Sequence, residues 1–275
     1  MELAYSLWPA QVAEKAKILL LHGMGGTGAL WRPVAAALEA DFSLLAPDQR
    51  GHGRSQIPSA PGGRDEPEYS PLEYGQDIVE TMDRLDFHPT WIVGHSMGVR
   101  SACAAAHLKP AWVKGLILVD LGFYGPAGGG LGQGLASFLA KLPLEFASRQ
   151  DARDFMTREC PDPSIAQYLM AVSVKASDGQ ITFPFDRAAL IQTIHAAQNV
   201  SVRGWVEELG KRGTPVLVLR GAESGVWSHA EFKEEQARFS AYSSITFREV
   251  SGAGHGLPFE KRLEFVQIIR DLISS

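Results

Sequence analysis

Apolar residues along the chain fall into two alternating patterns. Short continuous apolar runs, such as residues 17–21 and 115–119, are typical of strands covered on both faces of a parallel sheet. Between them, apolar residues recur at the spacing of an amphipathic helix. Strands that alternate with helices predict an α/β fold with a mostly parallel sheet. The predicted strands cover residues 3–8, 17–21, 42–47, 91–93, 115–120, 214–220 and 244–250, and the predicted core helices cover 31–38, 71–85, 99–108, 231–239 and 259–273.

The pattern changes between residues 122 and 211. Strand-like runs nearly disappear there, and helical spacing takes over, with Gly and Pro between the segments. We therefore predict a helical cap over 122–211, inserted into a core that comprises 1–121 and 212–275. The predicted cap helices cover residues 131–142, 149–159, 164–174, 186–196 and 203–209.

Two further segments are rich in residues that interrupt regular structure. Residues 56–70 carry many Pro, Gly and charged residues and predict a long loop that is mobile or forms a rim of the site. Ser70 is suited to cap the helix that follows, with Pro71 at its first position. The three glycines at 128–130 fit either a hinge at the start of the cap or a surface turn.

Composition narrows the class of protein. The chain has 275 residues, 45% apolar and 21% charged, which suits one large α/β domain or one domain with an insertion. The net charge is −5 and no basic cluster occurs, so we expect no nucleic-acid partner. The chain begins without the features of a secretion signal, and no apolar run approaches a membrane span. We expect a cytoplasmic protein without a membrane partner and leave its oligomeric state open. Cys103 and Cys160 show no disulfide pattern.

Residues 94–98, Gly-His-Ser-Met-Gly, stand between a predicted strand and a predicted helix. The tight turn that joins such elements strains its central residue and requires small neighbours, here Gly94 and Gly98. This turn holds the hydroxyl of Ser96 at the strand end, beside the backbone N–H of Met97 at the helix N-terminus. We predict that Ser96 is a catalytic nucleophile; the alternative is an ordinary Gly-rich turn.

A base for this serine is predicted in the Gly-rich loop 251–258, which follows the last strand. Sites in open parallel sheets form at the carboxyl ends of the strands, where Ser96 and this loop both lie. His255 can take the Ser96 proton as general base and return it to the leaving group. The alternative is a loop histidine without a function, which we expect for most of the other histidines.

The loop 22–28, His-Gly-Met-Gly-Gly-Thr-Gly, follows the strand beside the nucleophile strand. It can aim the backbone N–H of Met24 at the point where the N–H of Met97 also aims. Two such donors stabilise the oxyanion of a tetrahedral intermediate. The competing interpretation is a phosphate loop, but the Lys-Ser/Thr of a P-loop and the G-x-G-x-x-G spacing of a dinucleotide fold are absent.

Four segments together resemble the α/β-hydrolase superfamily, in particular serine esterases and lipases with a helical cap, such as bacterial carboxylesterases. They are residues 21–28, 47–55, 94–98 and 252–255, in the order typical of that family. The resemblance implies an eight-stranded, mostly parallel sheet with helices on both faces, a Ser-His-acid triad, and hydrolysis without a cofactor. It assigns the nucleophile to Ser96, the base to His255 and the oxyanion donors to Met24 and Met97. We predict no metal site.

The acid of the triad departs from the family pattern. Many members place it three or four residues after a glycine in the loop after the seventh strand, where this chain has Ser224 and Gly225. Glu223 is one or two residues early. Asp120, at the end of the strand beside the nucleophile strand, is the other candidate, and a subgroup of bacterial esterases combines this Asp with a Gly-x-x-Ser loop like residues 221–224. We favour Asp120; the alternatives are Glu223, a weakened dyad, and an Asp120 that only organises the turn into the cap.

The leading hypothesis is a serine carboxylic ester hydrolase that acts through an acyl-enzyme on small to medium esters or thioesters. The alternatives are a carbon–carbon bond hydrolase of ring-cleavage products, a cofactor-free haloperoxidase or perhydrolase, and, from a different class, a non-catalytic ligand-binding protein on a hydrolase scaffold. The cap would set substrate choice, with Trp227 beside the pocket, some cap side chains lining it and most forming the core of the cap. These cap residues are Phe123, Tyr124, Phe138, Leu139, Phe146, Phe155, Met156, Tyr168, Met170, Phe183 and Phe185.

Overall fold

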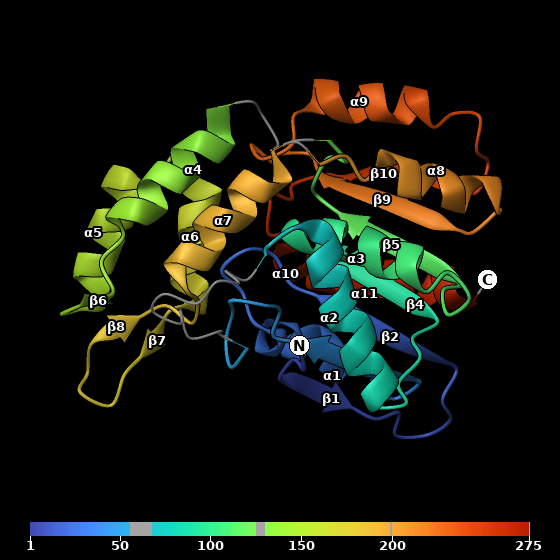
Figure 1. Ribbon diagram of the computed structural model, residues 1–275, viewed down its shortest axis with the longest axis horizontal. Coiled ribbons are helices and arrows are strands. Elements are labelled where there is room, and N and C mark those ends of the chain that lie inside the picture. The colour runs from blue at the N-terminus through green and yellow to red at the C-terminus, as the bar shows by residue number, and fades with distance from the viewer. Residues whose placement is uncertain (56–67, 125–129, 199, 275) are drawn as a thin grey trace.

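A seven-stranded sheet runs through the molecule (Figure 1), and the computed structural model describes residues 1–55, 68–124, 130–198 and 200–274. The strands are β1 (Tyr5–Trp8), β2 (Ala16–Leu21), β3 (Phe42–Pro47), β4 (Trp91–His95), β5 (Gly115–Val119), β9 (Val216–Gly221) and β10 (Ile245–Val250). Their order is β1-β3-β2-β4-β5-β9-β10, and every neighbouring pair except β1 and β3 is parallel. The predicted α/β fold with a mostly parallel sheet is confirmed.

The sheet has one strand fewer than the eight that the family resemblance implied. Across residues 1–55, only β1 precedes β2, and it pairs antiparallel with β3 at the edge, with Trp8 opposite Leu44. Pro9 then ends β1, because proline lacks the N–H that a ladder needs. Residues 10–15 include Gln, Glu and Lys without an alternating apolar pattern, and they return to β2 without forming a second antiparallel strand. The expectation of eight strands is therefore wrong for the described residues.

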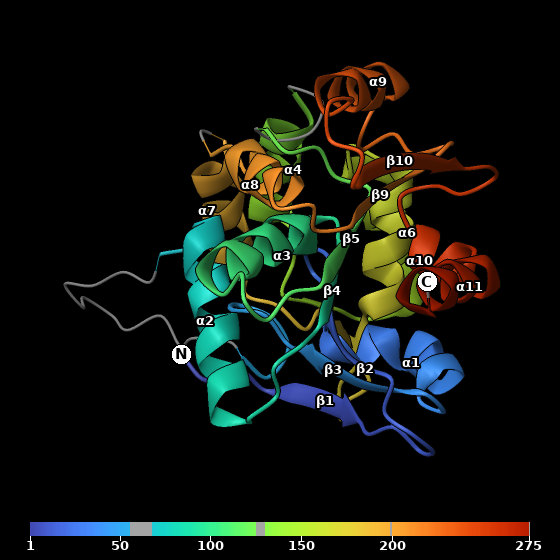
Figure 2. The same cartoon turned by 90° about the vertical axis from the view of Figure 1, so that its right-hand side faces the viewer.

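Helices cover both faces of this sheet (Figure 2). Successive residues of β2 point to opposite faces: Leu19 and Leu21 join one hydrophobic cluster, and Ile18 and Leu20 join the other. Both clusters are fully covered, which explains why the strand sequences are apolar throughout. The first face carries α2 (Pro71–Arg84), α3 (Met97–Leu108), α8 (Arg203–Lys211) and α9 (His229–Arg238), and the second carries α1 (Arg32–Leu38) and α11 (Arg262–Ser274), with η1 (Gly28–Trp31) and α10 (Leu257–Glu260) beside them.

A second group of elements lies to one side of the sheet (Figure 1) and packs around its own hydrophobic cluster. All five helices predicted between 122 and 211 occur, with ends within two residues of the predicted ones. The group also contains a small antiparallel sheet in the order β6-β8-β7 that we did not predict, because strands of two residues leave no alternating pattern. These elements are α4 (Gly130–Lys141), β6 (Glu145–Phe146), α5 (Arg149–Glu159), α6 (Pro163–Val172), β7 (Val174–Lys175), β8 (Ile181–Thr182) and α7 (Arg187–Ala197).

The fifth helix of that region, α8, packs differently from the other four. Val206 and Leu209 of α8 belong to the hydrophobic cluster of the first sheet face, together with Val99 of α3. The division into a core of 1–121 and 212–275 and a cap of 122–211 stays a prediction. Residues 128 and 129 of the predicted hinge and most of the loop predicted over 56–70 lie outside the described residues, and Gly130 begins α4.

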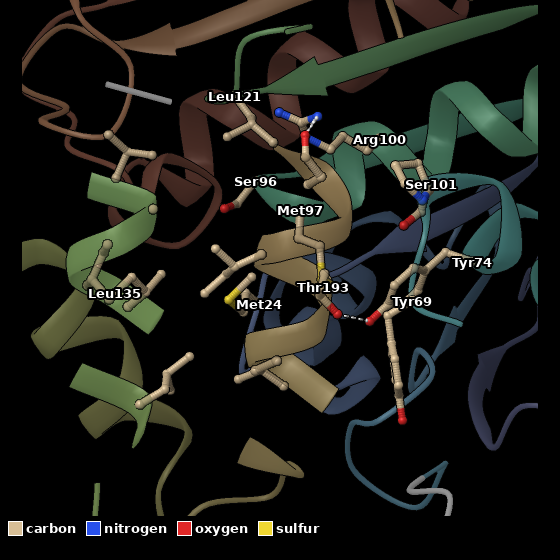
Figure 3. Close-up of a pocket in the computed structure, with 18 of the residues that line it drawn as sticks. Met24, Tyr69, Tyr74, Ser96, Met97, Arg100, Ser101, Leu121, Leu135 and Thr193 are labelled. Atoms are coloured by element: carbon tan, nitrogen blue, oxygen red, sulfur yellow. Dashed lines mark hydrogen bonds between the residues drawn. The ribbon is translucent and has the colours of Figure 1, made fainter. Parts of the chain in front are cut away.

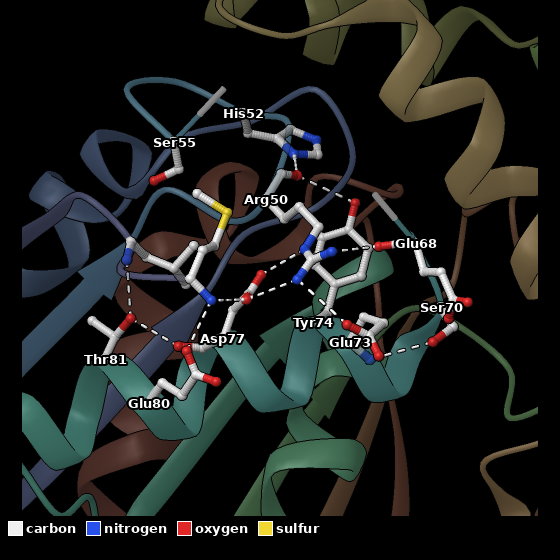
Figure 4. Close-up of polar contacts among 12 residues, drawn as sticks. Arg50, His52, Ser55, Glu68, Ser70, Glu73, Tyr74, Asp77, Glu80 and Thr81 are labelled. Atoms are coloured by element: carbon white, nitrogen blue, oxygen red, sulfur yellow. Dashed lines mark hydrogen bonds and ion pairs between the residues drawn. The ribbon is translucent and has the colours of Figure 1, made fainter. Parts of the chain in front are cut away.

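Helix α2 is anchored at its start and along its length by polar contacts (Figure 4). The side chain of Ser70 accepts a hydrogen bond from the Glu73 N–H at 3.3 Å, which confirms the predicted cap. Arg50 Nε and Nη2 donate to the two carboxylate oxygens of Asp77 at 2.6 and 2.8 Å, forming a buried bidentate ion pair. The backbone carbonyl of Arg50 accepts from the Tyr74 hydroxyl at 3.3 Å. The loop after β3 therefore fixes the position of α2, which forms one wall of the pocket described below.

Candidate active site

Ser96 joins β4 to α3 in a conformation that few residues adopt. Its φ of 53° and ψ of −124° lie outside the main regions allowed to non-glycine residues. A Cβ on Gly94 would lie 2.3 Å from the carbonyl oxygen of Gly98, and a Cβ on Gly98 would lie 2.4 Å from the carbonyl oxygen of Leu21. The turn therefore requires both glycines, and it presents the Ser96 side chain at the carboxyl end of β4.

His255 lies between Ser96 and Asp120 and contacts both. Its Nε2 is 3.0 Å from Ser96 Oγ, and its Nδ1 is 2.7 Å from Asp120 Oδ2. The loop after β10 reaches this position because it packs closely on the end of β9: a Cβ on Gly221 would lie 2.2 Å from the carbonyl oxygen of Gly254. The structure thus brings together the serine, the histidine and the favoured acid from three separate parts of the chain.

Asp120 is fully buried directly after β5, and its φ of 58° bends the chain away from the strand. Its Oδ1 accepts a hydrogen bond from the Gly221 N–H at 3.0 Å, and its Oδ2 accepts from the Ser224 hydroxyl at 2.5 Å. Together with His255, these contacts give the carboxylate three donors, which compensate for its removal from water. The contacts also fix the oxygen that faces the imidazole.

Glu223, the other candidate acid, is exposed to solvent, and its backbone N–H donates to the Ala253 carbonyl at 2.9 Å. The imidazole of His255 contacts Asp120 and not Glu223. Ser224 stands at the position where many family members have their acid. Its hydroxyl instead donates to Asp120, the acid of this site. We did not predict this contact, although a hydroxyl at the usual acid position was the signal that could have led to it.

Arg220 holds the loop that carries Ser224. Its buried guanidinium donates to the carbonyls of Trp227 at 2.6 Å, Ser224 at 3.0 Å and Ala222 at 3.2 Å, and it pairs with Glu249 at 2.6 Å. These bonds satisfy carbonyl groups on both sides of the turn. The Ser224 hydroxyl therefore meets Asp120 from a fixed loop.

The predicted oxyanion donors lie on both sides of Ser96. A Cβ on Gly23 would lie only 3.0 Å from the Ser96 Cβ, so the loop after β2 passes directly beside the serine. Met24 and Met97 both line the pocket that contains Ser96. Within the part of the chain that the structure describes, neither backbone N–H donates to another protein group. Two N–H groups are therefore available beside the hydroxyl.

Two buried histidines support the loops around the serine. His95 Nε2 donates to the backbone carbonyl of His255 at 2.7 Å, which ties the turn at Ser96 to the loop after β10. His22 Nδ1 donates to the Gly23 carbonyl at 2.8 Å, and its Nε2 accepts from a backbone N–H at 3.0 Å. Burial lowers the pKa of His22 to about 4 and the pKa of His95 to about 3. Both rings are therefore neutral at pH 7.

A pocket of about 120 Å³ lies beside Ser96 and His255 (Figure 3). This is somewhat smaller than a cavity of about 150 Å³ that holds benzene, so a group of about six heavy atoms fits. Most lining side chains are apolar, and none of them bears a carboxylate. The aliphatic residues from α4, α6 and α7 that line it are Leu135, Leu139, Ile165, Leu169, Leu190 and Ile194.

A few of the cap side chains named from the sequence line the pocket and most of them do not, as expected. Of the eleven cap side chains considered, Leu139 and Tyr168 line it, and several others, such as Phe146, pack in the cluster of the cap. Trp227, expected beside the pocket, packs on the sheet against Phe232, with ring centroids 5.1 Å apart. The other aliphatic lining residues besides Leu139 were not singled out, because a pocket wall and a helix core show the same apolar spacing.

Among the described residues, no group of three or more His, Cys, Asp or Glu side chains is arranged to hold a metal ion. No described helix combines the length and the apolar character needed to cross a membrane.

Comparisons with known proteins identify the family of the fold. The family model of the alpha/beta hydrolase fold matches residues 17–262. A putative esterase/lipase of Haemophilus influenzae is 23% identical over 245 residues, which cover 89% of this chain and 78% of that protein. A solved marine microorganism esterase has a TM-score of 0.75 and 20% identity, with 98% of both chains covered. At 20% identity, the structural similarity shows the fold alone.

Another relative matches a shorter segment of the chain at a higher sequence identity. An uncharacterized protein of Mycobacterium bovis is 38% identical over 105 residues, which cover 38% of this chain. The match spans 29% of the length of that protein. The substrate is therefore argued from the site.

Proposed function

Because the chain belongs to the alpha/beta hydrolase fold family, we propose that it is a serine hydrolase of small to medium carboxylic esters or thioesters. The observation that carries the proposal is the pair of contacts from His255 Nε2 to Ser96 Oγ at 3.0 Å and from His255 Nδ1 to Asp120 Oδ2 at 2.7 Å. This is the geometry that a nucleophile, a general base and an orienting acid require. Relatives and solved structures named as esterases support the same class of reaction.

In the proposed reaction, Ser96 Oγ attacks the ester carbonyl carbon while His255 Nε2 takes its proton. Asp120 accepts the Nδ1–H of His255, which keeps the Nε2 lone pair directed at the serine and stabilises the imidazolium that forms. The imidazolium then protonates the leaving alcohol as its C–O bond breaks, and the acyl group stays on Ser96. A water deprotonated by the same imidazole hydrolyses the acyl-enzyme and releases the acid.

Negative charge develops on the carbonyl oxygen during both attacks. We assign its stabilisation to the backbone N–H groups of Met24 and Met97, which flank Ser96 and have no other acceptor within the described residues. Loss of one such donor typically costs about 2.7–4 kcal/mol in the transition state. The apolar pocket excludes water around the oxyanion and strengthens these bonds.

A panel of p-nitrophenyl esters with acyl chains of two to twelve carbons, assayed on the wild type and on Ser96→Ala, tests the proposal. We expect turnover with a preference for short and medium chains, and a loss in the variant of at least about 10³-fold. Ser240→Ala, an exposed serine in a turn, is the matched control and should keep full activity. Activity on a dienoate diketone in place of the esters would favour a carbon–carbon bond hydrolase, and absence of turnover on both classes would contradict a hydrolase and favour a ligand-binding protein.

A further inference from the structure

The pocket beside Ser96 has two chemically different ends (Figure 3). Leu121 and Leu135 lie at one end, where the side chains are aliphatic. At the other end, along α3 and facing α2 and α7, lie the hydroxyl groups of Ser101, Tyr74 and Thr193. A pocket that only had to hold an alkyl chain would not need hydroxyl groups there, because polar groups inside apolar surroundings are costly unless they are paired.

Ser101 is a buried polar side chain at this end whose hydroxyl has no partner among the described residues. The residue is 1% exposed and lines the pocket. Its hydroxyl makes no hydrogen bond to any group in the described parts of the chain. A serine in a helix commonly bonds the carbonyl four residues earlier, and Ser101 does not do so. Its hydroxyl is therefore available to a group that enters the pocket.

Tyr74 and Thr193 provide the complementary half of the subsite. Their hydroxyl oxygens are 2.7 Å apart. The Thr193 hydroxyl also lies 2.8 Å from the Ala189 carbonyl, and the Tyr74 hydroxyl lies 3.3 Å from the Arg50 carbonyl. Each hydroxyl has one proton, and these internal bonds use both, so what remains toward the pocket is the ability to accept. With Ser101 as donor, this end matches a ligand group that both accepts and donates.

Arg100 also lines the pocket, but its charge is directed to the end of α7. Its Nη1 donates to the carbonyl of Val200 at 3.1 Å and to that of Ala197 at 3.4 Å. Cations are favoured at helix C-termini, where carbonyl groups lack partners within the helix. The geometry therefore favours a neutral hydroxyl over a carboxylate as the group bound at the polar end.

The position of His255 decides which part of an ester reaches the polar end. The leaving alcohol takes its proton from His255 and so lies on the side of His255 and Asp120. Leu121 follows Asp120 directly, which places the aliphatic end on that side. The acyl chain then extends along α3 toward Ser101. Ser101 lies five positions after Ser96 along the chain, which corresponds to a helical rise of about 7.5 Å or roughly six bonds of an extended chain.

We propose that the pocket selects acyl chains that carry a hydroxyl group about six bonds from the scissile carbonyl carbon, bound by Ser101, Tyr74 and Thr193. Such chains belong to esters of medium-chain hydroxy acids. The inference rests on the proposed function, since it names the substrate class of the same site. Without the subsite, a hydroxyl on the chain would be penalised for leaving water.

The test compares kcat/KM for p-nitrophenyl hexanoate, p-nitrophenyl 6-hydroxyhexanoate and mono-p-nitrophenyl adipate, in the wild type, Ser101→Ala and the surface control Ser240→Ala. We expect the wild type to prefer the hydroxylated ester over the hexanoate by up to about tenfold, as one or two hydrogen bonds allow. Ser101→Ala should lower that ratio by about fivefold or more, and Ser240→Ala should keep it. Because alanine is a better helix former than serine, the Ser101 variant is expected to fold.

Three results would overturn the inference: a wild-type ratio of hydroxyhexanoate to hexanoate below one, a ratio that Ser101→Ala does not change, or a preference for the adipate ester. Each of these leaves the ester hydrolase itself intact, since the esters are still turned over. Absence of turnover on all three esters in the wild type would instead contradict the proposed function.

Discussion

Replacement of Asp120 by Asn tests the most unusual part of the candidate triad. The three contacts of the carboxylate decide how an amide would sit. Asp120 Oδ1 accepts from the Gly221 N–H, so the amide oxygen of Asn must take that place, since an amide NH₂ there would face another donor. The amide NH₂ then occupies the place of Oδ2, between Ser224 and His255. The serine hydroxyl can accept from it, but the imidazole can do so only through Nδ1.

An imidazole that accepts at Nδ1 carries its proton on Nε2, the nitrogen that faces Ser96. It then has no lone pair with which to take the serine proton. The reverse orientation of the amide would leave a buried N–H unsatisfied, which costs about 1–3 kcal/mol. We therefore expect Asp120→Asn to fold and to lower kcat by up to about 10⁴-fold, equivalent to about 5.5 kcal/mol in the transition state.

The assay is steady-state hydrolysis of p-nitrophenyl butyrate, with the melting temperature of each variant as a check of folding. Glu223→Gln is the control, because this carboxylate is exposed and should leave kcat within about twofold. If Asp120→Asn kept more than about a tenth of the activity while Glu223→Gln lost about a hundredfold or more, the tautomer argument would be refuted and the acid would be Glu223.

Three further predictions concern groups around the site. Ser224→Ala should lower kcat about tenfold, because it removes a hydrogen bond to the Asp120 carboxylate and such bonds to charged groups contribute roughly 1.5–3 kcal/mol. An unchanged kcat in the same assay would show that the bond does not position Asp120. Asp77→Ala leaves the buried Arg50 guanidinium without its bidentate partner, so thermal unfolding should shift down by roughly 6–10 °C, from about 3–5 kcal/mol at about 2 °C per kcal/mol; a shift below about 2 °C would contradict a buried charge at that position. The pKa of His22 is lowered to about 4 and that of His95 to about 3, against 6.5 ordinarily. Between the lowered and the ordinary pKa, the unfolded chain binds more protons than the folded chain. The free energy of unfolding should therefore decrease as the pH is lowered, by about 2 kcal/mol per histidine at about pH 5 relative to neutral pH. Urea unfolding measures this change, and equal stability at both pH values would argue against neutral buried rings.

The parts of the site that could be predicted from the sequence are those whose chemistry depends on neighbours in the chain. The turn at Ser96 needs Gly94 and Gly98 within a few residues, and the apolar strand before it sets its direction. The loop with His255 follows the last strand of a parallel sheet. Its location at the carboxyl ends of the strands, where Ser96 also lies, was therefore predictable as well. The same reasoning predicted the strands of the seven-stranded sheet and nearly all helices, because periodicity is a local property.

What the sequence did not reveal depends on contacts between distant residues. The bond from Ser224 to Asp120 joins positions that are 104 residues apart, so no local pattern contains it, and its one signal is a hydroxyl at the usual acid position. His95 was noted only as part of the serine motif, although it holds the backbone of His255, 160 residues further on. The eighth strand was carried over from the resemblance, and the segment after Pro9 does not supply it.

In the proposed reaction, Ser96 is a nucleophile that His255 activates. The most direct test of this activation is intact-protein mass spectrometry after treatment with a fluorophosphonate, with peptide mapping of the label, on the wild type, Ser96→Ala and His255→Gln. We expect one label per chain on Ser96, none in Ser96→Ala, and labelling slowed by at least about 10³-fold in His255→Gln. An unlabelled wild type, or equal labelling of the wild type and His255→Gln, would contradict it.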